Sequence, residues 1–182
     1  MSKVYISIGD YAIREIEESD LSQLLEWRNS PEIHSKMLTD HIITWDEHLA
    51  WFKKIKEQDP TLNFAFVYQD KLVGYAGYTK YDPVTKTGDG GSYLAPELDL
   101  PVDAGIYSGE LLLYYGFETL GIKKTVTDVF LDNERVVKMN KLMGSKIISS
   151  HKLKKGGKVK EVVTMELTYE DWRKSFYREF FL

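Results

Sequence analysis

Runs that alternate apolar and polar residues, or that are rich in β-branched and aromatic residues, divide the chain into expected strands. These runs are Val4–Ile8, Tyr11–Ile16, Leu62–Tyr68, Leu72–Lys80, Gly91–Leu100, Thr125–Leu131, Lys146–Leu153 and Val159–Thr168. The first two form either a short hairpin or one bulged edge strand, so about seven strands are expected. The polar segment Asp82–Gly90, which precedes the fifth run, is predicted to be a mobile loop.

Apolar positions with a 3.6-residue repeat predict the helices. Helices are expected over Leu21–Ser30, Thr44–Gln58, Leu111–Leu120, Glu134–Met143 and Thr168–Leu182. Pro31 ends the first of these helices, and Gly121 and Gly144 end the third and the fourth. The polar pair Arg28-Asn29 therefore lies at a helix end.

The second helix begins with a capping box, since the Thr44 hydroxyl can accept from the Glu47 amide while the Glu47 side chain reaches back. Its buried face contains His48, Trp51, Phe52 and Ile55. Two interpretations of His48 stay open. It is either a core histidine bonded to the backbone, or it faces a substrate.

The order of these elements predicts an α/β fold, in which one mixed and mostly antiparallel sheet carries helices on both faces. Gly91–Leu100 and Thr125–Leu131 are joined through a helix, so they should be parallel neighbours with a right-handed crossover. The length of 182 residues fits one domain that spans residues 1–182.

A loop over residues 101–109 separates the fifth strand from the third helix. We expect Gly105 and Gly109 to reach positive φ, so that several backbone N–H groups point at one place with a helix dipole behind them. Such a loop favours an anionic ligand, in particular a phosphate.

The formal charge of −4 argues against a broad basic surface, and therefore against nucleic acid or an anionic membrane as a partner. No apolar run approaches the roughly 20 residues of a membrane span, which favours a cytoplasmic location. The chain has no cysteine, so any group transfer should be direct. The four histidines show no metal-binding spacing, and no metal is expected.

Three sequence segments point to a known family. They are Trp27-Arg28-Asn29-Ser30, Ile43-Thr44-x-x-Glu47-His48-x-x-Trp51, and Phe117-Glu118-x-Leu120-Gly121 with the following Asn133 and Lys141-Leu142-Met143-Gly144. Together they resemble the GCN5-related N-acetyltransferase (GNAT) superfamily, and within it the acetyltransferases of nucleotide-linked amino sugars in pseudaminic acid synthesis. The same segments are similar, more loosely, to ribosomal-protein N-terminal acetyltransferases.

The resemblance implies a GNAT fold with a splayed parallel strand pair in the middle of the sheet, and acetyl-CoA as co-substrate without a metal. It implies that the cofactor contacts Leu98, Asp103, Gly105, Ile106, Tyr107, Ser108, Gly109, Asn133, Asn140 and Lys141. Two features, the loop and the proton donor, depart from the family pattern. Aligning its Gln/Arg-x-x-Gly-x-Gly/Ala loop on Gly105 places Val102 and Tyr107 at the other two sites, and Asn140 stands where many relatives carry a tyrosine acid.

For the chemistry, the resemblance implies that backbone N–H groups near Leu98 polarise the thioester carbonyl. Glu97 is the first choice as general base, followed by Asp99 and His48. The expected acceptor is a small-molecule amine, that of a nucleotide sugar, contacted by Trp27, Arg28, Asn29, His48, Trp51, Tyr78 and Tyr93. Two alternatives stay open, namely acetylation of peptide N-termini and a non-catalytic acetyl-CoA sensor. A homodimer is also left open.

Overall fold

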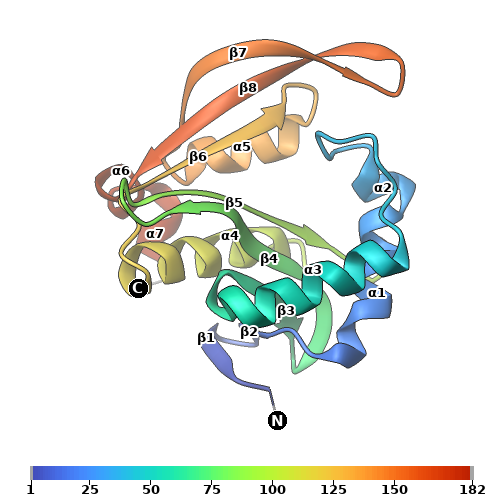
Figure 1. The fold of residues 1–182 in the computed structure, drawn as a ribbon. Coiled ribbons are helices and arrows are strands. Elements are labelled where there is room, and N and C mark those ends of the chain that lie inside the picture. The colour runs from blue at the N-terminus through green and yellow to red at the C-terminus, as the bar shows by residue number, and fades with distance from the viewer. Residues whose placement is uncertain (1, 181–182) are drawn as a thin grey trace.

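The computed structural model describes residues 2–180 and contains one eight-stranded sheet with the order β1-β2-β3-β4-β5-β6-β8-β7 (Figure 1). The strands are β1 (Val4–Ile8), β2 (Tyr11–Glu15), β3 (Asn63–Tyr68), β4 (Lys71–Asp82), β5 (Thr87–Leu94), β6 (Lys124–Phe130), β7 (Lys146–Lys155) and β8 (Lys158–Thr168). All neighbouring strands are antiparallel except β5 and β6, which are parallel. This is the predicted mixed, mostly antiparallel α/β sheet, with eight strands because β1 and β2 form a separate hairpin.

The helices are α1 (Leu21–Asn29), α2 (Pro31–His34), α3 (Trp45–Gln58), α4 (Ala104–Tyr114), α5 (Glu134–Leu142), α6 (Tyr169–Arg173) and α7 (Phe176–Phe180). Short 3-10 turns cover Glu18–Asp20 and Pro60–Leu62, and a π-helical turn, Tyr115–Thr119, continues α4. The capping box of α3 is present as predicted, because Thr44 accepts from the Glu47 amide and Glu47 accepts from the Thr44 amide.

Helices cover both faces of the sheet, as expected. On one face α4 packs on the central strands, where Phe64, Phe66 and Ala76 are buried against Leu111 and Leu112. On the opposite face α1 and α3 bury Leu24, Trp27 and Phe52 with Ala65 of β3. Adjacent positions of β3 thus point to different cores, which is the period of two that a strand requires.

The parallel pair separates almost as soon as it forms. Its register consists of Thr87 opposite Lys124 and Gly88 opposite Thr125. Beyond these residues β5 continues to Leu94 and β6 to Phe130 without further pairing to each other, and the wedge between them interrupts the middle of the sheet (Figure 1). The Thr127 hydroxyl crosses the narrow part of this wedge and donates to Asp89 Oδ1 at 2.7 Å.

The segment expected to be a mobile loop, Asp82–Gly90, is mostly strand. β4 extends to Asp82 and β5 begins at Thr87, so only a four-residue turn lies between them. The glycines of β5 suggested a loop, but close packing explains why these positions are glycine. A Cβ built on Gly88 or Gly90 would lie 3.0 or 2.8 Å from the ring of Tyr78. The strand needs glycine there because the tyrosine occupies the space.

The prediction for the glycine loop was wrong in its geometry. α4 begins at Ala104 rather than at Leu111, so Gly105 and Gly109 are helical and neither has a positive φ. The loop is residues 95–103, with Asp103 as the N-cap. A helix still follows the loop, but it begins earlier in the chain than predicted.

The predicted C-terminal helix is also different. α6 and α7 are separate short helices around Lys174 and Ser175, and both begin at a hydroxyl residue. The last part of that prediction, residues 181–182, lies outside the described residues.

Candidate functional site

The N-terminus of α4 lies beside the end of β5. The hydroxyls of Ser92 on β5 and Ser108 on α4 are 3.0 Å apart, and Ser108 also donates to the Gly105 carbonyl at 2.9 Å. Asp103 holds the cap in place, because its carboxylate accepts from the Tyr11 hydroxyl at 2.8 Å and its carbonyl accepts from the amides of Ile106 and Tyr107. The Tyr107 ring stacks on the Tyr11 ring with centroids 4.3 Å apart.

Gly105 and Gly109 differ in what surrounds them. A Cβ built on Gly105 would meet only Leu94 Cδ1, at 4.0 Å, so open space lies in front of the first turn of α4. A Cβ on Gly109 would lie 2.7 Å from Met143 Cε, at the end of α5. Gly105 therefore fits a binding role, whereas Gly109 allows α4 and α5 to approach each other.

The remaining predicted cofactor residues are spread over two elements. Leu98 is exposed in the loop before α4. Asn133 is the N-cap of α5, but its side chain makes no capping hydrogen bond. The Asn140 amide lies 3.8 Å from Met165 Sδ, and Lys141 is exposed on α5, where it lines a shallow cavity with Lys138.

Aromatic side chains form a continuous group on the α1 and α3 side of the sheet. The Tyr75 and Tyr93 rings stack at 5.4 Å, and the edge of Trp51 meets Tyr75 at 6.2 Å. The Tyr93 hydroxyl donates to the Leu24 carbonyl at 3.1 Å. Next to Tyr93, a Cβ on Gly91 would meet nothing within 4 Å, so this face of β5 borders open space.

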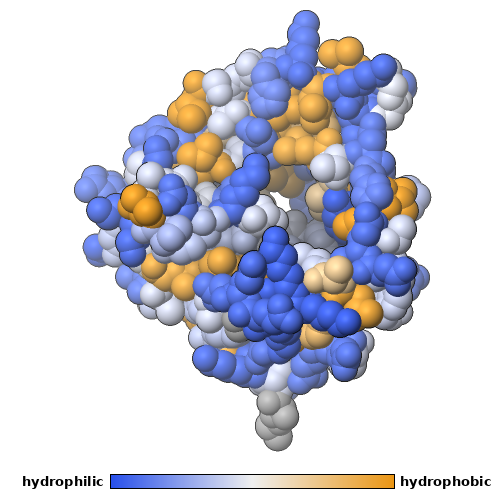
Figure 2. Space-filling model, in the orientation of Figure 1, coloured by the Kyte–Doolittle hydropathy of each residue, from blue (hydrophilic) through white to orange (hydrophobic). Residues whose placement is uncertain are grey.

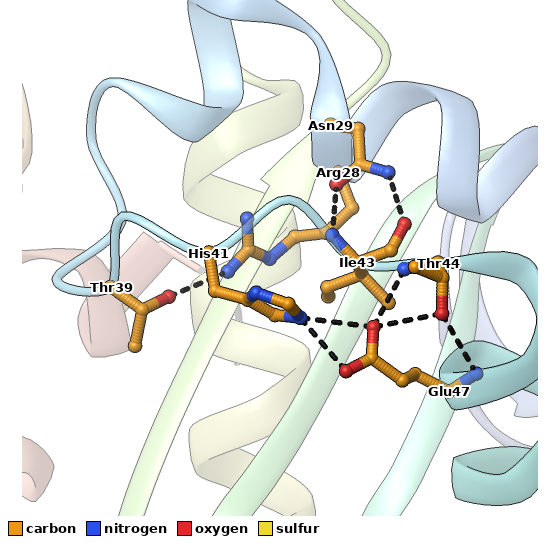
Figure 3. A network of polar contacts seen from close by, with 7 residues as sticks. All are labelled: Arg28, Asn29, Thr39, His41, Ile43, Thr44 and Glu47. Carbon is orange, nitrogen blue, oxygen red and sulfur yellow. Dashed lines mark hydrogen bonds and ion pairs between the residues drawn. The ribbon is translucent and has the colours of Figure 1, made fainter.

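Arg28 lies at the end of α1 in a polar network with the segment that leads into α3 (Figure 3). Its Nη2 donates weakly to Thr39 Oγ1 at 3.4 Å, whereas its Nη1 is buried and has no hydrogen-bond partner among the described residues. Burial lowers the pKa of the Arg28 guanidinium, and nearby Tyr93 acts in the opposite direction. Arginine nevertheless stays charged at neutral pH, so this is a half-buried cation with one buried and unused donor group.

Asn29, the other member of the predicted pair, has a structural use. Its amide donates to the Ile43 carbonyl at 2.8 Å and accepts from the Ile43 amide at 3.0 Å (Figure 3). A second contact fixes the same segment, since His41 Nε2 lies 2.9 Å from both carboxylate oxygens of Glu47. These bonds attach residues 41–43 to the ends of α1 and α3.

His48 is a buried residue of α3 whose ring stacks on Trp51 with centroids 5.1 Å apart. Burial lowers the pKa of His48, while a hydrogen bond with the backbone of Leu21 partly offsets this effect. The ring is therefore neutral at pH 7, and its Nε2 has no partner among the described residues. Both interpretations of His48 thus find support, a backbone-bonded core histidine and a residue with one nitrogen unused.

The acidic candidates Glu97 and Asp99 both lie in the exposed loop between β5 and α4. Glu97 is held in place, because its carboxylate accepts a hydrogen bond from the indole Nε1 of the buried Trp27. This contact brings two predicted site residues together from α1 and the loop. Tyr78, in contrast, is a core residue on the α4 face, where its hydroxyl donates to the Leu112 carbonyl at 2.9 Å.

Sequence reasoning missed Thr39, Asp40 and Lys155. They meet only because the β7–β8 hairpin returns to the segment after α2, where Lys155 Nζ is 3.1 Å from Asp40 Oδ1. A buried lysine in an otherwise exposed strand cannot be recognised from local pattern. Tyr75 was also missed, since its alternation within β4 equally predicts a core residue.

Residues 2–180 contain neither a metal-binding cluster nor a membrane-spanning helix. No cluster of three or more histidine and carboxylate side chains in this part of the chain could hold a metal ion. None of its helices combines the length and the apolar character needed to cross a membrane.

Comparisons with known proteins show the family and the fold. Residues 11–146 match the acetyltransferase (GNAT) domain family. The chain is 29% identical over 126 residues to Acetyltransferase PseH of Campylobacter jejuni serotype O:23/36, covering 69% of this chain and 76% of that protein. It is 28% identical over 130 residues to the same enzyme of serotype O:2.

Solved structures share the fold. Spermidine N-acetyltransferase from Vibrio cholerae, in complex with CoA and spermine, superposes with a TM-score of 0.79 at 18% identity, covering 90% of this chain and 98% of that one. An N-acetyltransferase from Staphylococcus aureus Mu50 gives 0.75 at 18% identity, covering 88% and 99%. The chain belongs to the acetyltransferase (GNAT) family and is an N-acetyltransferase.

Proposed function

We propose that this enzyme transfers an acetyl group from acetyl-CoA to the amine of a nucleotide-linked amino sugar. The observation that carries the choice of acceptor is the buried Nη1 of Arg28, which no described residue satisfies. Leaving a buried charged donor without a partner costs stability, so a ligand that pairs with it is favoured. The diphosphate of a nucleotide sugar suits a guanidinium, which binds phosphate oxygens in a fork.

The donor site follows from the wedge and from α4. A pantetheine arm carries amide groups, and it could bond to the strand edges that β5 and β6 leave unpaired. The diphosphate of CoA would lie at the first turn of α4, where Gly105 leaves space and the helix dipole favours negative charge. Asp103 is the one carboxylate at that cap, and Tyr11 already engages it.

The acceptor side is the aromatic group of α1, α3 and β5. Tyr93 and Trp51 offer apolar surface for a sugar or base, and the open space at Gly91 connects them with the wedge. The similarity to Acetyltransferase PseH spans more than two thirds of both chains, which supports an acceptor of the same class. Polyamines are less suited, because Arg28 would repel a cation.

The residues support direct transfer. The acceptor nitrogen would bond to the acetyl carbon as the carbon–sulfur bond breaks, so the amine must lose a proton and the departing thiolate must gain one. Glu97 is the proposed base, positioned by the Trp27 indole. Asn140 cannot donate a proton at neutral pH, so water would protonate the thiolate.

The test is a turnover assay with acetyl-CoA and four acceptors, followed by release of free CoA. The acceptors are a UDP-linked 4-amino-4,6-dideoxy sugar, the same sugar without its nucleotide, spermidine, and a ribosomal-protein N-terminal peptide. We expect turnover of the UDP-linked sugar, with kcat/KM about a hundredfold above that of the free sugar, because one charged hydrogen-bonded contact contributes about that factor. Preference for the peptide or spermidine would contradict the proposed acceptor, and binding of acetyl-CoA without any turnover would indicate a sensor.

A further inference from the structure

The tip of the β7–β8 hairpin contacts the segment that follows α2, far from it in sequence. The buried side chain of Lys155 donates to the Thr39 carbonyl and pairs with the Asp40 carboxylate at 3.1 Å. The Gly156 amide donates to both carboxylate oxygens of Asp40, at 2.8 and 3.1 Å. We name these four residues, Thr39, Asp40, Lys155 and Gly156, the clasp.

The clasp closes one side of the wedge. β5 and β6 diverge beyond Gly88 and Thr125, with α1 packed on the β5 side and the hairpin paired to β6. The segment after α2 is attached to α1 through Asn29, so the clasp joins the two sides. Figure 1 shows the hairpin extending toward this segment, and Figure 2 shows a hollow in the surface near the middle of the same view.

Thr39 connects the clasp with the proposed acceptor site. Its carbonyl accepts from Lys155 and its hydroxyl accepts from Nη2 of Arg28. Since one residue makes both bonds, the place of Thr39 beside the guanidinium depends on the hairpin tip. Arg28 Nη2 therefore has this one weak bond, and Nη1 has no hydrogen-bond partner among the described residues.

The burial of Lys155 needs a reason beyond holding the hairpin. The Lys155 side chain is 7% exposed, whereas Lys146 of the same strand pairs with Asp171 at 2.8 Å while 68% exposed. Desolvating an ammonium group is unfavourable unless it is fully paired, and the hairpin is already held by the β7–β8 ladder, which has one register shift between Ile147 and Ser149. Burying this ammonium beside the Asp40 carboxylate, whose side chain is 51% exposed, is costly for stability alone, yet the pair fixes a geometry.

We propose that Lys155 and Asp40 are positioning residues that set the acceptor specificity of the enzyme; this rests on the proposed function. The clasp holds Thr39 beside Arg28 and encloses the acceptor side of the wedge. A small charged acceptor is thereby oriented at the guanidinium, and a polypeptide chain is kept from entering.

The experiment compares Lys155→Met, which keeps the aliphatic stem, with Lys146→Met as the matched control on the same strand. For Lys155→Met we expect the KM for the UDP-linked amino sugar to rise about tenfold, less than for loss of Arg28 itself because only the position of Thr39 is loosened, while calorimetry gives an acetyl-CoA Kd within about twofold of the unchanged protein. The rate on the peptide relative to the sugar should rise about tenfold. Asp40→Asn should act in the same direction, and Lys155→Arg should restore part of the acceptor affinity.

Three results would overturn this inference. They are unchanged sugar KM in Lys155→Met, equal losses of sugar and acetyl-CoA affinity, or the same losses in Lys146→Met. The outcome is separable from that of the proposed function. If the unchanged enzyme does not acetylate the UDP-linked sugar, the proposed function fails first, whereas an active enzyme that is insensitive to Lys155→Met contradicts the clasp alone.

Discussion

At the scale of single residues, the proposed acceptor site contains two polar atoms that lack hydrogen-bond partners in the described part of the chain. Arg28 Nη1 and His48 Nε2 are both buried on the α1 and α3 side, and neither has a hydrogen-bond partner among the described residues. Buried polar groups are normally hydrogen-bonded. An unpaired atom therefore either lowers the stability of the protein for the sake of binding, or receives its missing hydrogen bond from a ligand. Substitutions can separate these effects, because removing the unpaired atom relieves the cost and abolishes the binding.

Arg28→Met should lower acceptor affinity without lowering stability. The methionine keeps most of the apolar stem and removes a buried charge, so we expect the free energy of unfolding in urea to stay equal or to rise by about 1 kcal/mol. The KM for the UDP-linked amino sugar should rise about a hundredfold, with acetyl-CoA affinity unchanged. A large loss of stability would instead show that Arg28 is a structural residue, paired in solution through contacts other than the acceptor.

Glu97→Gln should lower kcat by about a hundredfold or more, because a general base contributes about that factor. The glutamine oxygen can still accept from the Trp27 indole, so the loop should keep its position. His48→Asn is the comparison. If His48 is the base, its variant loses kcat and Glu97→Gln does not, and the pH profile of kcat/KM measured for each variant identifies the group whose titration disappears.

At the scale of elements, the strands and helices could be predicted where local pattern and tertiary packing agree. The α3 capping box and the hairpin turn at Gln69 and Asp70, both with positive φ, follow from short-range chemistry. Two of the errors occurred at glycines. Gly88 and Gly90 belong to a strand, and Gly109 to a helix, because Tyr78 and Met143 occupy the space that a side chain would need. No local pattern reveals such a long-range contact.

The candidate site likewise contains residues that local pattern predicts and residues that only long-range contacts bring together. Arg28, His48 and Trp51 could be selected because they lie at a helix end or on one helical face. The clasp could not, since Asp40 and Lys155 are joined only by the path of the β7–β8 hairpin. Pairing between distant segments depends on the whole topology, which a single sequence does not specify locally.

Helix α4 offers a test with two glycines. Gly105→Val should weaken acetyl-CoA binding about tenfold, because the added side chain would enter the space in front of the first turn, and should change stability little. Gly109→Val should destabilise the protein by about 1–3 kcal/mol through overpacking against Met143. Calorimetry and urea unfolding of both variants check this. Equal binding losses in the two would refute the assignment of the phosphate site to Gly105.

α4 also carries a buried acid that should make stability depend on pH. Burial raises the pKa of Glu110 to about 7, while the hydrogen bond from Trp172 and the charge of Arg178 act in the opposite direction. The folded state therefore binds this proton more strongly than the unfolded state. The corresponding stability is fully present below about pH 4.5 and is lost as the pH rises through 7.

Glu110→Gln should remove that dependence. A pKa rise of this size corresponds to roughly 3 kcal/mol, so the variant should exceed the unchanged protein by that order at pH 8 and match it near pH 4.5. Urea unfolding at both pH values measures the difference, with Glu134→Gln on the exposed start of α5 as the control. Parallel pH profiles of the two proteins would mean that Glu110 titrates normally.

At the scale of the whole molecule, the sheet consists of two parts joined by a short parallel contact. One part contains β1 to β5 and the other contains β6 to β8. A ligand in the wedge would contact both parts. Ligand binding should therefore change the stability of strands that lie in different parts of the sequence.

Acetyl-CoA at a hundredfold its Kd should raise the free energy of unfolding by about 2.7 kcal/mol, which is a shift of about 5–10 °C in Tm for a chain of this size. Hydrogen exchange should slow on the unpaired parts of both β5 and β6. Gly105→Val, tested at the same concentration, should show a smaller shift. Protection confined to one strand would contradict a cofactor lying between them.

The early divergence of β5 and β6 has a further consequence for behaviour without ligand. Each strand exposes unpaired main-chain amides and carbonyls to an internal space. At the outer edge of a sheet, such groups would allow a strand of another polypeptide to pair with them. Here α4 lies on one face, α1 and α3 lie on the other, and the hairpin tip bars the side, so a neighbouring molecule cannot reach those groups. The enzyme can thus keep open hydrogen-bonding positions for a slender guest without becoming prone to self-association through them.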